Sequence, residues 1–293
     1  MGSKMFGGLT LKELARRVWR ESNADNVFGR AAELAYYFLL ALFPMLIFLT
    51  AMVGFLPGLR ENIMDSLATI VPGDAMALVR ETLQDVTEHS STGLLSFGIL
   101  GTLWAASNGV AAVMGTLNTA YDAKESRPWL RMRLVAIGLT VGLALLVVGG
   151  VALIMFSDRL TAWAAAALGI GPVFEMIWQV VHYLLGLALL FIGIEVIYYF
   201  GPNVEQSWKW ITPGAVFAVI AIILGSLALS FYLRFAPSYS ATYGSLGAVI
   251  ILMLWLYILG LVLLLGGEIN SEIEQAAGKP RVEKEPPDHL QAA

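Results

Sequence analysis

Apolar runs of about 20 residues recur along nearly the whole chain, and they limit its fold more than any other feature. At about 1.5 Å per residue, a helix of this length crosses the hydrocarbon layer of a bilayer. Only 14% of the residues are charged, whereas a water-soluble domain carries about 25%. Because lipid offers no hydrogen-bonding partner to an open backbone, the spanning segments must be helical. The sequence therefore predicts an all-α, polytopic membrane protein.

Six segments are long and apolar enough to be transmembrane helices, and they divide the chain into three parts. The predicted helices cover residues 35–55, 93–115, 134–156, 176–200, 211–232 and 243–267. We expect residues 1–33 to form a cytoplasmic amphipathic segment, residues 34–275 the membrane domain, and residues 276–293 a disordered polar tail. Six crossings place both chain ends on the same side of the membrane.

The distribution of basic residues predicts which side that is. Segments on the side of the N-terminus contain 14 of the 18 lysines and arginines, and the opposite segments contain 4. Lysine and arginine accumulate in cytoplasmic loops of membrane proteins. We therefore expect both termini in the cytoplasm.

Two further segments are amphipathic rather than uniformly apolar. Residues 9–21 predict a helix with one apolar and one basic face, which can lie on the inner membrane surface or pack on the protein's own inner loops. The longest outer loop, residues 56–92, contains two amphipathic pieces separated by Pro72 and Gly73. We expect two short helices over the outer mouth of the bundle, with a loose surface loop as the alternative.

Four stretches of the sequence carry a resemblance to a known family. They begin at residues 33, 94, 198 and 243 and read ELAYYFLLALFPMLIFL, LLSFGILGTLWAASNGVAAVMGTLNTAYD, YYFGPNVEQSWKWITPGAVFA and YGSLGAVIILMLWLYILGLVLLLGGEINSEIE. In this order and spacing they resemble the YihY/virulence factor BrkB family of bacterial inner-membrane proteins, formerly labelled ribonuclease BN. The chain departs from the family pattern at Asn108, where the family has a basic residue.

The resemblance implies six helices with both termini inside the cell and a location in the bacterial inner membrane. The role that it favours is export or flipping of a lipid or another amphipathic molecule. A ribonuclease is not expected, because a metallo-nuclease needs several ligands in one site. The chain has only His89, His182 and His289, which are widely separated in the sequence.

Ionisable residues inside membrane helices are costly, so each is a candidate functional residue. Glu33, Glu195 and Glu268 fall in the cytoplasmic third of the predicted bundle, and we expect a water-filled vestibule there, open to the cytoplasm. The predicted pathway residues are Glu33, Tyr36, Tyr37, Pro44, Ser107, Asn108, Glu195, Tyr198, Tyr199, Asn203, Glu268 and Asn270. The alternative is that the acids cap helix ends at the interface and that the tyrosines belong to the aromatic belt.

Proline residues predict where membrane helices bend or stop. Pro44 lies near the middle of the first predicted span, where it removes a backbone hydrogen bond and predicts a kink. Such a break can form a binding site in a transporter, or it can serve only packing. Pro202 and Asn203 are read mainly as the stop signal of the fourth span.

Basic residues at helix ends are candidates for binding lipid headgroups, because arginine binds phosphate through two parallel hydrogen bonds. These candidates are Arg127, Arg131, Arg133, Arg159 and Arg234. The alternative is that they are topology signals and anchors that extend toward the interface. Nucleic acid is not expected as a partner, because the basic inner loop is short.

No catalytic site, metal site or cofactor is predicted. The chain has no cysteine, no GxxxxGK[ST] phosphate loop, and no HExxH or GxSxG motif. Transport would therefore be passive, ion-coupled or powered by a partner. The leading hypothesis is a transporter or flippase whose partners are membrane lipids, and the alternative is a non-transporting scaffold or assembly factor that binds envelope proteins. The sequence leaves the oligomeric state open.

Overall fold

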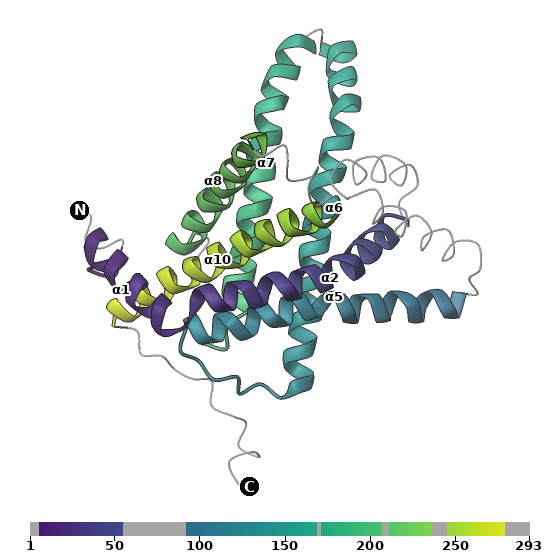
Figure 1. The fold of residues 1–293 in the computed structure, drawn as a ribbon. Helices are drawn as coiled ribbons and strands as arrows, with labels where there is room; N and C mark the ends of the chain where they lie inside the picture. The colour runs from purple at the N-terminus through teal and green to yellow at the C-terminus, as the bar shows by residue number, and fades with distance from the viewer. Residues whose placement is uncertain (1–5, 55–91, 169–170, 207–210, 236–244, 279–293) are drawn as a thin grey trace. The chain divides into compact units, whose positions relative to one another are not determined.

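The computed structural model describes residues 6–54, 92–168, 171–206, 211–235 and 245–278 (Figure 1). In these ranges the chain forms seven α-helices and no β-strand. The helices are α1 (Leu11–Ala24), α2 (Val27–Gly54), α5 (Thr92–Ala120), α6 (Trp129–Leu168), α7 (Gly171–Phe200), α8 (Pro213–Phe235) and α10 (Ser245–Ala276). The prediction of an all-α protein is confirmed.

Five of these helices contain a segment that is long and apolar enough to cross a membrane. The segments are Val27–Phe48 in α2, Trp129–Gly150 in α6, Tyr183–Phe200 in α7, Pro213–Tyr232 in α8 and Val249–Ala276 in α10. The remaining predicted span, residues 93–115, lies within α5, whose first side chains are outside the described part. The six-span topology stays a prediction. The helices expected within residues 56–92 and the tail beyond Gly278 also lie outside the described residues.

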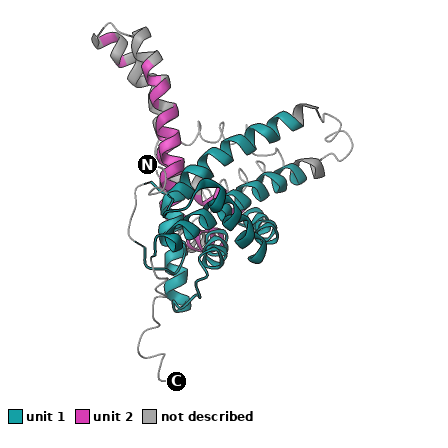
Figure 2. Cartoon of the chain, turned by 90° about the vertical axis from the view of Figure 1, so that its left-hand side faces the viewer, with its two compact units in different colours: residues 1–41, 107–139, 194–293 teal, residues 42–106, 140–193 magenta. Residues whose placement is uncertain are grey.

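The chain divides into two compact units, which are coloured separately in Figure 2. Unit 1 consists of residues 1–41, 107–139 and 194–293, and unit 2 of residues 42–106 and 140–193. Unit 1 therefore contains α1, α8 and α10 together with one end each of α2, α5, α6 and α7. Every predicted site residue except Pro44 and Arg159 belongs to unit 1.

The chain enters α2 through a capped amphipathic helix and a tight corner. The backbone N–H of Glu13 donates to the Thr10 hydroxyl (3.3 Å), and the Glu13 carboxylate accepts the backbone N–H of Thr10 (2.9 Å). This reciprocal pair satisfies donors at the start of α1. Asn26 adopts a left-handed conformation (φ 51°), which asparagine tolerates, so α2 can begin soon after α1 ends. Helix α2 then continues through Pro44, so the predicted break does not end it.

In unit 1, α10 packs against both α1 and α8. Its approach to α8 is close because Gly214 and Gly266 face each other, and a β-carbon on either would overlap the other's carbonyl oxygen. A separate core cluster of Met114, Ala136 and Leu139 joins α5 to α6. These contacts leave little space between neighbouring backbones, and they bring polar side chains of different helices within hydrogen-bonding distance.

Candidate functional site

The N-terminus of α8 is held by side chains from three segments. Glu195, on α7, accepts a hydrogen bond from the backbone N–H of Thr212. The Thr212 hydroxyl in turn accepts the backbone N–H of Ala215 (3.2 Å). Asn270 Oδ1, on α10, accepts the backbone N–H of Gly214 (2.8 Å). Glu195, Thr212 and Asn270, which we call the α8 cap, thus satisfy donors that a helix N-terminus leaves without partners.

Two buried tyrosines adjoin the α8 cap. Tyr198 donates its hydroxyl hydrogen to the backbone carbonyl of Leu263 on α10 (2.8 Å). Tyr121, which follows α5, lies beside Asn270, and burial raises the pKa of its hydroxyl. Glu195 is only 4% exposed. The α8 cap and its tyrosines are therefore part of the interior of unit 1.

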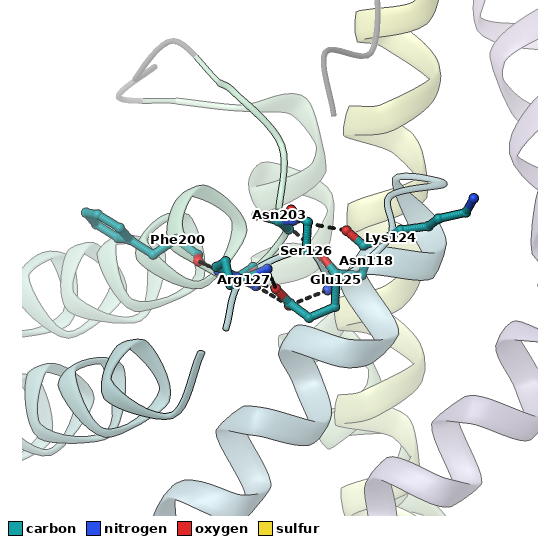
Figure 3. A network of polar contacts seen from close by, with 8 residues as sticks. Asn118, Lys124, Glu125, Ser126, Arg127, Phe200 and Asn203 are labelled. Carbon is teal, nitrogen blue, oxygen red and sulfur yellow. Dashed lines mark hydrogen bonds and ion pairs between the residues drawn. The ribbon is translucent and has the colours of Figure 1, made fainter. Parts of the chain in front are cut away.

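A second network ties the loop between α5 and α6 to the end of α7 (Figure 3). The backbone N–H of Asn203 donates to Asn118 Oδ1 (2.6 Å). The Asn203 side-chain amide donates to Ser126 Oγ (2.7 Å) and to the backbone carbonyl of Lys124 (3.0 Å). This network, with the ion pair of Arg127 described next, is called the α7 clasp below. It fixes the exit of α7 against a loop that is distant in the sequence.

Arg127 completes the α7 clasp. Its guanidinium donates to the two carboxylate oxygens of Glu125 (2.6 and 2.7 Å) and to the backbone carbonyl of Gly201 (3.0 Å). Burial acts to raise the pKa of Glu125, but hydrogen bonds from Arg127 and Asn118 outweigh it and hold this pKa below its usual value. The Arg127 guanidinium is thus engaged by partners within the protein.

A pair of carboxyl groups joins the corner between α1 and α2 to α10. The side chains of Asp25 and Glu268 lie close enough to influence each other's ionisation, and Glu268 is only 1% exposed. Burial, and then the negative charges of Asp122 and Glu21, raise the pKa of Asp25. Among the described residues, Glu268 Oε1 is buried without a hydrogen bond. Two neighbouring carboxyl groups ionise less readily together than either does alone, so this acid pair is a candidate carrier of an exchangeable proton.

The structure divides the predicted pathway residues between different environments. Glu195, Tyr198 and Asn270 are buried in or beside the α8 cap, and Asn203 is buried in the α7 clasp. Glu268 is buried in the acid pair, and Ser107 is buried as well. The exposed ones are Glu33, Tyr36, Tyr37 and Asn108, whereas Pro44 and Tyr199 are half-buried. The predicted residues therefore do not form one continuous cluster.

The predicted headgroup residues also differ from one another. Arg133 is buried, and its guanidinium donates to Asn108 Oδ1 on α5 (2.8 Å). This contact places a cation beside the position where the family resemblance led us to expect a basic residue. Arg131 is exposed at the start of α6. The side chains of Arg159 and Arg234 lie outside the described part of the chain.

Sequence reasoning missed Asp25, Asn118, Glu125 and Thr212. All four lie at or near helix ends, where a polar residue does not by itself indicate a functional site. Thr212 carried a signal, because a threonine followed by proline is typical of a helix N-cap and first helical position. Asp25 carried none, because its partner Glu268 lies on the last helix of the chain. Among the described residues, no three His, Cys, Asp or Glu side chains gather as a metal site would require.

Relatives of the chain share most of its length. It is 36% identical over 252 residues to the ribonuclease-like protein YfkH of Bacillus subtilis (strain 168), which covers 86% of this chain and 92% of that protein. It is 27% identical over 271 residues to a UPF0761 membrane protein of Tolumonas auensis, with coverage of 88% and 83% respectively. A UPF0761 membrane protein of Xanthomonas campestris is 26% identical over 289 residues, and the chain spans 63% of its length.

A family model also matches the sequence. No solved structure matches the chain. Residues 18–290, which include all seven described helices except the first residues of α1, match the family described as virulence factor BrkB. The five segments that are long and apolar enough to cross a membrane agree with the membrane proteins among its relatives. The chain therefore belongs to the virulence factor BrkB family of membrane proteins.

Proposed function

We propose that the protein is a transporter or flippase of lipid-like or amphipathic molecules in the bacterial inner membrane. The observation that carries this proposal is the acid pair of Asp25 and Glu268. Buried ionisable groups are costly in membrane proteins and are typical of proton relays and ion pathways. Because the sequence has no nucleotide-binding loop, a proton gradient is the energy source that this site fits.

A purely structural role explains the acid pair poorly. Asp122 and Glu21 lie close enough to raise the pKa of Asp25, so deprotonation adds repulsion in a partly buried place. A carboxylate with an amide or a cation would hold the same helices together at less cost. The protonated pair attaches the α1–α2 corner to α10, and the doubly charged pair favours their separation. Two states of this kind are what alternating access requires.

We further propose six spans, with α5 as the second and both termini in the cytoplasm. Support comes from the 14 lysines and arginines, of 18, on the side of the chain ends. Unit 1 contains both chain ends, the acid pair and the α8 cap. In this orientation the acid pair is near the cytoplasm, where it can exchange its proton and where an amphipathic substrate of the inner leaflet would enter.

We propose no enzymatic activity for this chain. The ribonuclease-like name belongs to the relative in Bacillus subtilis. Three histidines at positions 89, 182 and 289, with no cysteine, give the sequence few residues from which to build a metallo-nuclease site. The α8 cap and the α7 clasp are built from amides, hydroxyls, carboxyls and one guanidinium, all engaged with partners within the protein.

A scaffold role is the second candidate, and one observation favours it. Glu195, Tyr198 and Asn203 are occupied by hydrogen bonds within the protein. Hydrogen-bonded networks of this kind fix a structure rather than bind a passing molecule. On this view the polar residues of unit 1 position a rigid surface for envelope proteins, and the acid pair is a pH-sensitive part of that surface.

Lipid movement in reconstituted vesicles distinguishes the two candidates. Purified protein is placed in vesicles that contain phospholipids with a fluorescent headgroup, and dithionite added outside bleaches the outer leaflet. A transporter exposes inner-leaflet lipid faster than protein-free vesicles do. The experiment is run with zwitterionic and anionic lipids, with and without a pH gradient, for the wild type and for Glu268→Gln.

The matched control is Glu205→Gln, because Glu205 is an exposed glutamate that follows α7. We expect wild type and Glu205→Gln to accelerate bleaching equally, and Glu268→Gln to lose the response to the gradient. If neither lipid class moves faster than in protein-free vesicles under any gradient, the transport proposal is wrong and the scaffold role is favoured.

A further inference from the structure

One face of α1 is fixed on the protein. Leu14 is buried, and α1 packs against α10. Arg17 Nη1 forms an ion pair with the buried Glu272 Oε2 of α10 (3.7 Å). Because α1 is anchored along this side, its other faces have a defined direction relative to α2 and α10.

The adjacent face of α1 is apolar and exposed. Leu11 is 69% exposed and Trp19 is 63% exposed, and the exposed Ala15 lies between them. A spacing of four residues places these three side chains in one stripe along the helix. Exposure of a tryptophan and a leucine on a helix that already has a packed face calls for a second contact surface.

Two cations border this stripe. Lys12 and Arg16 are exposed, and each immediately follows a stripe residue in the sequence, so they lie along its edge. Arg20 is different, because its guanidinium is engaged by Glu21 (2.9 Å). Among the residues that the structure describes, Lys12 and Arg16 form no ion pair. The stripe therefore combines apolar side chains with available positive charge.

The stripe continues onto the flank of α2. The Trp19 ring meets the ring of Phe28 edge to face, with centroids 6.1 Å apart, and Phe28 is 39% exposed. Phe28 lies in the first turn of α2, within the membrane-crossing segment that begins at Val27. Tyr36 and Leu40, further along α2, are also exposed. The exposed apolar surface thus runs from α1 onto the part of α2 that would face lipid.

We propose that the stripe of Leu11, Ala15 and Trp19, with Lys12 and Arg16, docks on the anionic phospholipid surface of the membrane that the protein spans. Tryptophan and leucine enter the headgroup region, where an amphipathic helix buries its apolar face. Lys12 and Arg16 meet phospholipid phosphates, and each cation near an anionic surface strengthens attachment roughly fivefold. The leaflet is the one on the side of the N-terminus, which the charge distribution predicts to be cytoplasmic. This surface is independent of the transport proposal.

Because the chain contains no cysteine, a single introduced cysteine can be labelled at one known position. A single cysteine is introduced as Ala15→Cys or Ala24→Cys and labelled with an environment-sensitive fluorophore in the full-length protein. Both alanines are exposed on α1, and nine residues at 100° each place Ala24 on the opposite side of the helix. Each variant is reconstituted in vesicles of phosphatidylcholine with or without phosphatidylglycerol, and spin-labelled lipids serve as quenchers.

We expect the probe at position 15 to emit at shorter wavelength and to be quenched severalfold more strongly than the probe at position 24. Replacing Lys12 and Arg16 with glutamine should lower the ratio of docked to free helix by about 25-fold in anionic vesicles, at roughly fivefold per charge. The same replacement should have little effect in neutral vesicles. Raised salt should mimic it, because salt screens exposed charges.

Equal quenching of the two probes would overturn the proposal. So would a probe at position 15 that is shielded from water yet untouched by lipid quenchers, since protein would then cover the stripe. Quenching that is the same in neutral and anionic vesicles would overturn the role of Lys12 and Arg16.

Discussion

Replacing Glu195 with alanine tests whether the α8 cap is structural. The Glu195 carboxylate is buried and accepts the backbone N–H of Thr212 at the start of α8. A hydrogen bond to a charged group contributes about 1.5–3 kcal/mol, and its removal leaves the donor buried without a partner. The truncated side chain also leaves a cavity, so we expect Glu195→Ala to lower the free energy of unfolding by about 2–4 kcal/mol.

Glutamine at the same position separates the hydrogen bond from the charge. The amide oxygen of Glu195→Gln can still accept the N–H of Thr212, so this variant should lose only the attraction between a negative charge and the helix N-terminus. That attraction is worth about 0.3–1 kcal/mol in most proteins. We therefore expect the alanine variant to lose severalfold more stability than the glutamine variant.

Unfolding in mixed detergent micelles with increasing dodecyl sulfate provides the measurement, followed by the fluorescence of the 8 tryptophans. Glu205→Ala is the control, because a substitution at an exposed site changes stability by less than about 0.5 kcal/mol. If Glu195→Ala is as stable as Glu205→Ala, the α8 cap does not stabilise the protein. A stable Glu195→Ala variant that fails to move lipid would return Glu195 to the substrate pathway.

Three further substitutions test the other contacts of unit 1. Gly266→Ala should lower the free energy of unfolding by about 1–3 kcal/mol in the same micelle assay, because its β-carbon would overlap α8. Gly115→Ala is the control, because a β-carbon there would meet open space. Equal effects of the two substitutions would contradict the close packing. Asn203→Ala should increase trypsin cleavage after Lys124 severalfold, because the α7 clasp no longer holds that loop; unchanged cleavage would show that the clasp is dispensable. Asp25→Asn should remove a pH dependence of the free energy of unfolding. Because the native pKa of Asp25 is raised, its contribution to stability is complete below the unfolded pKa and is lost as pH rises through the native pKa. The stability of the wild type relative to Asp25→Asn should therefore fall as pH rises above about 4, the usual pKa of an aspartate, and a constant difference would contradict the shift.

The helices could be predicted from the sequence because their causes are local. A long apolar run predicts a membrane helix wherever it occurs, and α7 ends at Phe200, where the sequence predicts its end. Helix α6 reaches Leu168, well beyond the predicted end at residue 156. The segment after the predicted end reads SDRLTAWAAAAL. It combines helix-forming alanines with few helix-breaking residues, so the helix extends beyond its most apolar part.

The direction of polar side chains could not be predicted in the same way. Tyr36 and Tyr37 follow Glu33 at spacings of three and four, and all three residues are exposed, whereas Glu195 and Tyr198, with the same spacing of three, are buried. A membrane helix is apolar on every side, so its sequence does not show which side packs inward. The acid pair depends on a contact between the first corner and the last helix, which only the folded chain brings together.

The proton in the acid pair is the most direct point at which to test the proposed function. Vesicles with a trapped pH-sensitive dye report proton movement while a headgroup-labelled phospholipid crosses the bilayer under an imposed lipid imbalance. We expect the wild type to move protons together with lipid, and Glu268→Gln to move lipid without protons or neither of them. Lipid movement by the wild type with no accompanying proton flux, or equal proton flux with Glu268→Gln, would contradict proton coupling through Asp25 and Glu268.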